Sequence, residues 1–94
     1  MNFRIFWTDF AKEDYANILT FLQNEFGVDT ALKFLDKTEK TVEQIETFPL
    51  SFPISDINTR VRKAVLNKNT SLIYRVNSDE IELLFFGDNR MKEN

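Results

Sequence analysis

The chain has 94 residues, a length that suits a single small domain spanning residues 1–94. It contains neither cysteine nor histidine, which excludes disulfides, thiol nucleophiles and the usual zinc and imidazole chemistry, so we expect no metal and no cofactor. The formal net charge of −3 disfavours direct binding to nucleic acid, because neutralising several phosphates normally needs a basic surface.

The N-terminal segment alternates Phe3, Ile5 and Trp7 with Arg4 and Phe6, a period of two that predicts a strand over residues 3–7. This opening is too short and too charged for a signal peptide. Elsewhere no apolar run approaches the length that spans a membrane. We therefore expect a cytoplasmic protein that does not enter the membrane.

Two helices are predicted next. Thr8 and Asp9 can cap the first helix, and Gly27 is a natural C-terminal stop. The second helix is expected from about Asp29 to Phe48, just before Pro49 ends it. Because only a few residues separate the helices, they should form an antiparallel hairpin whose apolar stripes face one surface. The stripes are Ala11, Tyr15, Ile18, Leu22 and Phe26 on the first helix, and Ala31, Leu35, Thr38, Val42 and Ile45 on the second.

The segment 49–59 is a loop with many apolar residues: Leu50, Phe52, Ile54 and Ile57. We expect these side chains to pack against the helices; a patch that faces a partner is the alternative. Three strands should follow, over residues 60–66, 71–76 and 81–86, joined by turns rich in Asn, Ser and Asp. The predicted fold is α+β: an N-terminal strand, a helix hairpin and a three-stranded antiparallel meander, forming one sheet packed on two helices.

The lengths of the turns suggest a register for these three strands. A four-residue loop over 67–70 places Arg62 opposite Arg75, and a two-residue loop at Ser78 and Asp79 places Arg75 opposite Glu82. This row of charges would share a face with Ile73, Leu84 and Phe86. Two interpretations remain open: Glu82 neutralises the arginines on a solvated face, or the face receives an acidic and apolar segment of a partner.

The order of elements, together with the motifs V61-R-K-A-V, S71-L-I-Y-R-V, I81-E-L-L-F-F and G87-D-N-R, resembles the RelE/ParE superfamily of type II toxin–antitoxin toxins over nearly the whole chain. The resemblance is strongest to the ParE-like plasmid stabilisation proteins. Met91 stands where those proteins often have a proline after the terminal arginine.

Two branches of this superfamily imply different activities. RelE-like members cut messenger RNA on the ribosome with basic side chains on the sheet and an arginine and tyrosine near the C-terminus. On this resemblance, Arg62 and Arg90 match two such positions, Ala64 and Ser71 replace two others, and no tyrosine follows Tyr74. ParE-like members poison DNA gyrase through protein contact and need no catalytic residues.

From the resemblance we expect a ParE-like toxin that inhibits growth by contact with DNA gyrase, without being an enzyme, and that is neutralised by a cognate antitoxin. The alternatives are a ribosome-dependent endoribonuclease and a non-toxic relative that binds an antitoxin. The residues expected to bind a partner are Arg62, Arg75, Leu84, Phe86 and Arg90, with no catalytic residue unless the chain is RelE-like.

Overall fold

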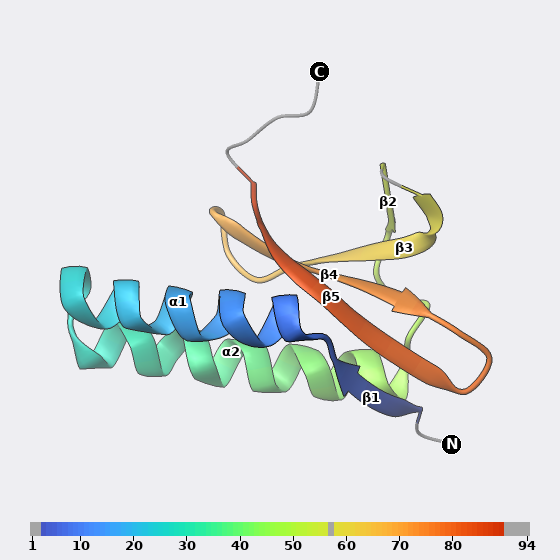
Figure 1. Ribbon diagram of the computed structural model, residues 1–94, viewed down its shortest axis with the longest axis horizontal. Coiled ribbons are helices and arrows are strands. Elements are labelled where there is room, and N and C mark those ends of the chain that lie inside the picture. The colour runs from blue at the N-terminus through green and yellow to red at the C-terminus, as the bar shows by residue number, and fades with distance from the viewer. Residues whose placement is uncertain (1–2, 57, 90–94) are drawn as a thin grey trace.

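The helices form an antiparallel hairpin that covers one face of a five-stranded sheet (Figure 1). The structure is a computed structural model and describes residues 3–56 and 58–89. Its sheet has the order β1-β5-β4-β3-β2, with β1 parallel to β5 and the other neighbours antiparallel. The elements are β1 (Arg4–Trp7), α1 (Asp9–Phe26), α2 (Val28–Thr47), β2 (Ile54–Ser55), β3 (Asn58–Val65), β4 (Thr70–Val76) and β5 (Glu80–Asp88). The predicted α+β fold is confirmed; the short β2 was not predicted.

Local signals in the sequence fix the ends of the helix hairpin. Thr8 caps α1 by accepting a hydrogen bond from the amide of Ala11 at 3.1 Å, and its hydroxyl lies 2.8 Å from the carbonyl oxygen of Leu83 in β5. Gly27 separates the helices with φ of 97°, a backbone conformation that glycine adopts without strain. Each predicted helix boundary is thus confirmed to within about one residue.

The core lies between the helices and the inner face of the sheet, which is the face that the helices cover. Central strand β4 contributes Leu72 and Tyr74, both fully buried, and α2 contributes Phe34 and Ile45. Burial of such apolar side chains is the main stabilising term for a chain of this size. The buried cluster comprises Ala11, Phe34, Ile45, Ala64, Leu66, Leu72, Tyr74, Ile81, Leu83 and Phe86.

The segment between α2 and β3 follows the sheet edge more than it covers the helices. Phe52 packs on the core as predicted, but Leu50 and Ile54 are 65% and 52% exposed, so the prediction was wrong for these two side chains. The reason is a backbone tether: the amide of Lys63 in β3 donates to the carbonyl of Pro53 at 3.0 Å. Ile57 lies outside the described residues.

Candidate functional site

The predicted register between β3 and β4 is wrong by one residue. Arg62 pairs with Tyr74, and Val61 pairs with Arg75. The hairpin closes more tightly than expected because the side-chain oxygen of Asn67 accepts hydrogen bonds from the amides of Asn69 and Thr70, at 2.8 and 2.9 Å. A slip of one residue transfers every side chain of β3 to the opposite face of the sheet.

Arg62 therefore lies on the helix-covered side, away from Arg75. Its guanidinium Nη1 donates to the carbonyl oxygen of Phe52 at 2.6 Å and contacts that of Leu50 at 3.3 Å, so it holds the loop that follows α2. Beside it, the Tyr74 hydroxyl donates to the carbonyl of Pro49 at 2.6 Å. Burial raises the pKa of Tyr74 to about 12, an effect that the nearby positive charge of Arg62 partly offsets.

Arg75 and Glu82 form the ion pair that the turn length predicted, on the outer face of the sheet. Their register is confirmed, and Arg75 donates to Glu82 Oε1 through Nη2 at 2.7 Å and Nε at 3.1 Å. The same oxygen accepts from the side-chain amide of Asn77 at 2.9 Å. These hydrogen bonds, first from Asn77 and then from Arg75, lower the pKa of Glu82 below its ordinary value.

A bulge in β5 separates the two apolar residues expected beside this pair. Leu83 pairs with Tyr74 and Phe85 with Ile73, so Leu84 is an additional residue in the strand. Leu84 is half-buried and does not belong to the core cluster. Beyond the bulge the alternation reverses, which turns Phe86 inward.

Phe86 is consequently a core residue, with 8% of its surface exposed, and was wrongly placed on the exposed face. Its ring stacks on Tyr15 with centroids 5.4 Å apart and planes 8° apart, and it lies 6.1 Å from Trp7. Burial of a large ring among other rings stabilises this arrangement over the exposed one. Of the five predicted partner-binding residues, Arg75 lies on the outer face and Leu84 is half-buried at the bulge, whereas Arg62 and Phe86 face the helices; Arg90 lies outside the described residues.

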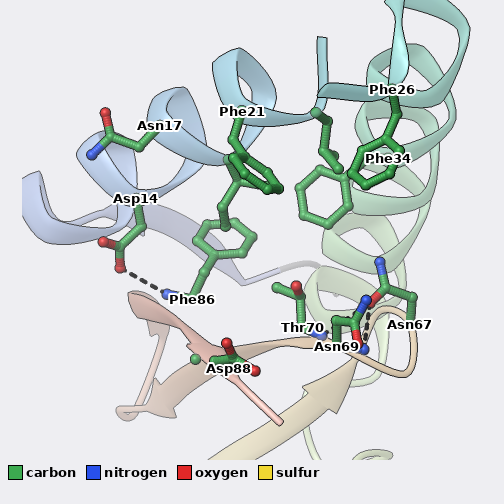
Figure 2. Close-up of a pocket in the computed structure, with 13 residues that line it drawn as sticks. Asp14, Asn17, Phe21, Phe26, Phe34, Asn67, Asn69, Thr70, Phe86 and Asp88 are labelled. Atoms are coloured by element: carbon green, nitrogen blue, oxygen red, sulfur yellow. Dashed lines mark hydrogen bonds between the residues drawn. The ribbon is translucent and has the colours of Figure 1, made fainter. Parts of the chain in front are cut away.

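Sequence reasoning missed a groove of about 390 Å³ between the helix hairpin and the β3–β4 loop. In Figure 2, Phe21, Phe26 and Phe34 project from the helices, and Phe86 approaches from β5. Phe21 and Phe26 are 57% and 64% exposed, unusual for aromatic residues beside a cavity. Phe26 was predicted on the core-facing stripe of the first helix, and its exposure shows that this prediction was wrong; Phe21 was given no role.

Polar groups surround this apolar floor. Asp14 of α1 accepts a hydrogen bond from the backbone amide of Phe86 at 3.0 Å, drawn as a dashed line in Figure 2. Since β1 pairs with Glu80–Leu83, this contact occupies a part of the β5 edge that no strand within residues 3–56 and 58–89 covers. The opposite end is closed by Asn67 and Asn69 of the β3–β4 loop.

The shifted pKa values in the described part of the chain have local structural causes. Among residues 3–56 and 58–89, the side chains whose pKa is clearly shifted are Tyr15, Tyr74 and Glu82, and burial or local hydrogen bonding accounts for each shift. The described part of the chain contains no group of three potential metal ligands. It also contains no helix that is both long and apolar enough to cross a membrane.

Comparison with known proteins places this arrangement among toxins. The family model of the ParE toxin of the type II toxin–antitoxin system parDE matches residues 5–93. Among solved structures, the chain is similar to the chromosomal ParDE system from P. aeruginosa, with a TM-score of 0.78 and 22% identity over 92% of this chain and 95% of that one. No curated protein sequence matches the chain.

Two further structures share the fold at lower similarity. The YoeB dimer from Staphylococcus aureus has a TM-score of 0.63 and 18% identity over 90% of this chain and 94% of that one. The E. coli DinJ-YafQ toxin-antitoxin complex has a TM-score of 0.65 and 12% identity over 96% of both chains. At such identities the likeness concerns the fold, and the structures include complexes with antitoxins.

Proposed function

Because this chain belongs to the family of ParE toxins of type II toxin–antitoxin systems, we propose that it inhibits DNA gyrase by protein contact and is neutralised by a cognate antitoxin. The toxin class follows from the family. Gyrase as the target and contact as the mode of action are our proposal.

The hydrogen bonds of the Arg62 guanidinium are the observation that supports this proposal most directly. Cleavage of RNA through the 2′-hydroxyl needs a base, an acid and cations that stabilise the additional charge on phosphorus. Arg62 is the described residue that matches a basic position of the RelE-like nucleases, and its guanidinium instead holds the carbonyls of Phe52 and Leu50. Arg75, the other arginine of the predicted row, is paired with Glu82. Both cations therefore serve the fold, which favours contact over catalysis.

Arg75 and Leu84 remain our candidates for contact with a protein partner through the outer face. The Arg75 side chain keeps 43% of its surface exposed while paired, so a carboxylate of a partner can still approach it. An Arg75→Gln variant should bind its partner more weakly, and Arg60→Gln, a change to an exposed residue of neighbouring β3, is the matched control.

The decisive experiment measures DNA supercoiling by purified gyrase with increasing amounts of the chain. We expect supercoiling to stop, and to resume when the protein encoded by the adjacent small open reading frame is added. Unimpaired supercoiling at saturating protein rejects gyrase as the target. Codon-positioned cuts in a translating extract would instead assign the chain to the ribonucleases, and harmless overexpression without antitoxin would assign it to non-toxic relatives.

A further inference from the structure

We propose that the outer face of the sheet, opposite to the helices, binds a folded surface of gyrase that presents an apolar side chain next to a carboxylate. This inference rests on the proposed function, which supplies gyrase as the target. The carboxylate contacts Lys63, and the apolar side chain lies over Gly87. The structure brings Lys63 to this face because the observed register differs by one residue from the expected one, which had placed Arg62 there.

The pairing of the strands defines which side chains share the outer face. Directly paired residues lie on the same face, so each set of pairs gives one row across the strands. The first row comprises Val61, Arg75, Glu82 and Phe6, the second comprises Lys63, Ile73 and Phe85, and the third comprises Val65, Ser71 and Gly87. Successive rows are about 7 Å apart along a strand, so one small contact covers parts of two rows.

Lys63 provides a positive charge on this face that the chain itself does not neutralise. The other cation of the three rows, Arg75, is paired with Glu82. Lys63 takes part in none of the ion pairs found within residues 3–56 and 58–89. A carboxylate of a partner can therefore approach the Lys63 ammonium without displacing an acidic group of the chain, and such complementary charges select the partner.

Gly87 leaves a position without a side chain on the same face. Its backbone does not require glycine, because Gly27 is the described residue with a positive φ. A Cβ atom at residue 87 would lie 3.6 Å from the ring of Phe85 and 3.9 Å from Ile73, which are ordinary contact distances, so a side chain would fit. Glycine weakens a strand and often marks a place where another molecule approaches closely. The position over Gly87 is thus suited to a side chain of a partner.

Apolar groups beside this position determine the kind of side chain that it accepts. Val65, in the same row, is 53% exposed, and Phe85 is half-buried. Between Val65 and Gly87, the buried Ser71 donates its hydroxyl to Asn89 Oδ1 at 2.7 Å. An aliphatic side chain over Gly87 would cover accessible carbon atoms on both sides, whereas a charged one would lose its hydration without gaining a partner.

The form of this face favours a folded partner over a flexible segment. A flexible segment typically binds in a groove or pairs with the open edge of a strand. Lys63, Ile73 and Phe85 lie instead on three adjacent strands, β3, β4 and β5, and none of them lines the groove on the helix side. Such an open sheet face is complementary to a preformed surface, which folded gyrase provides.

The test measures binding of the purified full chain to immobilised gyrase holoenzyme by surface plasmon resonance at two salt concentrations, with supercoiling assayed in parallel. Gly87→Ala fills the position over Gly87 and should weaken binding by about tenfold, a usual effect of an additional methyl group in a packed contact. Lys63→Gln should weaken binding by roughly fivefold and reduce the dependence of the association rate on salt. The concentration that halves supercoiling should rise by the same factors.

Matched controls separate this site from charge and size in general. Lys33→Gln removes an exposed lysine of α2, and Ser78→Thr adds one methyl group to an exposed turn residue. Both variants should bind gyrase as the unaltered chain does. In urea denaturation, Gly87→Ala should be at least as stable as the unaltered chain, because alanine restricts the unfolded state where the native backbone accepts it. Its weaker binding would then not arise from a loss of folding.

The outcomes distinguish this inference from the function on which it depends. If the unaltered chain neither binds gyrase nor stops supercoiling, the proposed function fails, and this inference fails with it. If it does both, and the Lys63 and Gly87 variants act equally well, the inference about the outer face alone is overturned. A larger loss for Lys63→Glu than for Lys63→Gln supports the carboxylate partner. Variants that inhibit gyrase normally but no longer bind the protein of the adjacent open reading frame assign this face to the antitoxin and overturn the inference.

Discussion

Removal of the Tyr74 hydroxyl should change the dependence of stability on pH in a direction that the structure fixes. In the Tyr74→Phe variant, the carbonyl of buried Pro49 loses its 2.6 Å hydrogen bond. The net contribution of such a bond, with the cost of leaving its partner unsatisfied, is about 1–2 kcal/mol. At pH 7 we therefore expect the variant to be less stable by that amount, with a melting temperature roughly 5–10 °C lower.

At alkaline pH the difference in unfolding free energy between the unaltered protein and the Tyr74→Phe variant should shrink and then change sign. Tyr74 has a pKa of about 12 in the folded protein against 10.0 ordinarily, so the unfolded chain releases its proton first as the pH rises. The stabilising effect of the neutral hydroxyl is complete below pH 10 and is lost on the way to pH 12, at a total cost of roughly 2–3 kcal/mol. The phenylalanine variant has no such loss.

Urea denaturation followed by the fluorescence of the single tryptophan, Trp7, measures both effects. The free energies of unfolding of the two proteins should converge between pH 10 and 12. The pKa of Tyr15 is also raised, mainly by burial, so the Tyr15→Phe/Tyr74→Phe double variant should remove the remaining contribution of tyrosine. Stability curves that stay parallel across this range would refute the assigned cause of the Tyr74 shift.

Three further substitutions test other parts of the structure. Phe86→Ala should cost about 3–5 kcal/mol of unfolding free energy because it empties the centre of an aromatic cluster. A loss below about 1 kcal/mol in urea denaturation would show that the ring is not buried. Glu82→Gln should lower the unfolding free energy at neutral pH, because Asn77 and Arg75 stabilise the charged form of Glu82 and lower its pKa. The greater stability of the unaltered protein should be complete above pH 4.5 and be lost as the pH falls through the lowered pKa. Calorimetry at pH 3 and pH 7 checks this, and an equal difference at both values contradicts it. Thr8→Ala should cost about 1–2 kcal/mol and Thr8→Ser much less, since serine keeps the capping oxygen; equal melting temperatures of the two variants would show that the cap is unimportant.

The helix hairpin could be predicted because its signals are local. Thr8, Gly27 and Pro49 each end an element through their own backbone or side-chain chemistry, which does not depend on the rest of the fold. The same holds for the turn at Ser78 and Asp79, which placed Arg75 opposite Glu82 correctly. Family membership was also predictable, because the order of motifs extends over most of the chain.

The faces of the sheet could not be predicted, because two single-residue irregularities decide them. One is the tight loop made by the side chain of Asn67, which shifts β3 and moves Arg62 away from Arg75. The other is the bulge at Leu84, which depends on what the ring of Phe86 gains among Trp7 and Tyr15. The groove was missed for a related reason: its residues are distant in sequence, and they come together only with the observed β3–β4 register and the bulge at Leu84.

The bulge at Leu84 has a consequence for comparing this chain with its relatives. A homologue that lacks the additional residue keeps one uninterrupted alternation along the strand, so an alignment without a gap there would match its inward positions to outward positions of this chain from Phe85 onward. Residue roles transferred through such an alignment would be inverted. Placing a one-position gap at Leu84 restores the correspondence, and the aromatic doublet Phe85-Phe86 then shows which ring belongs to the interior.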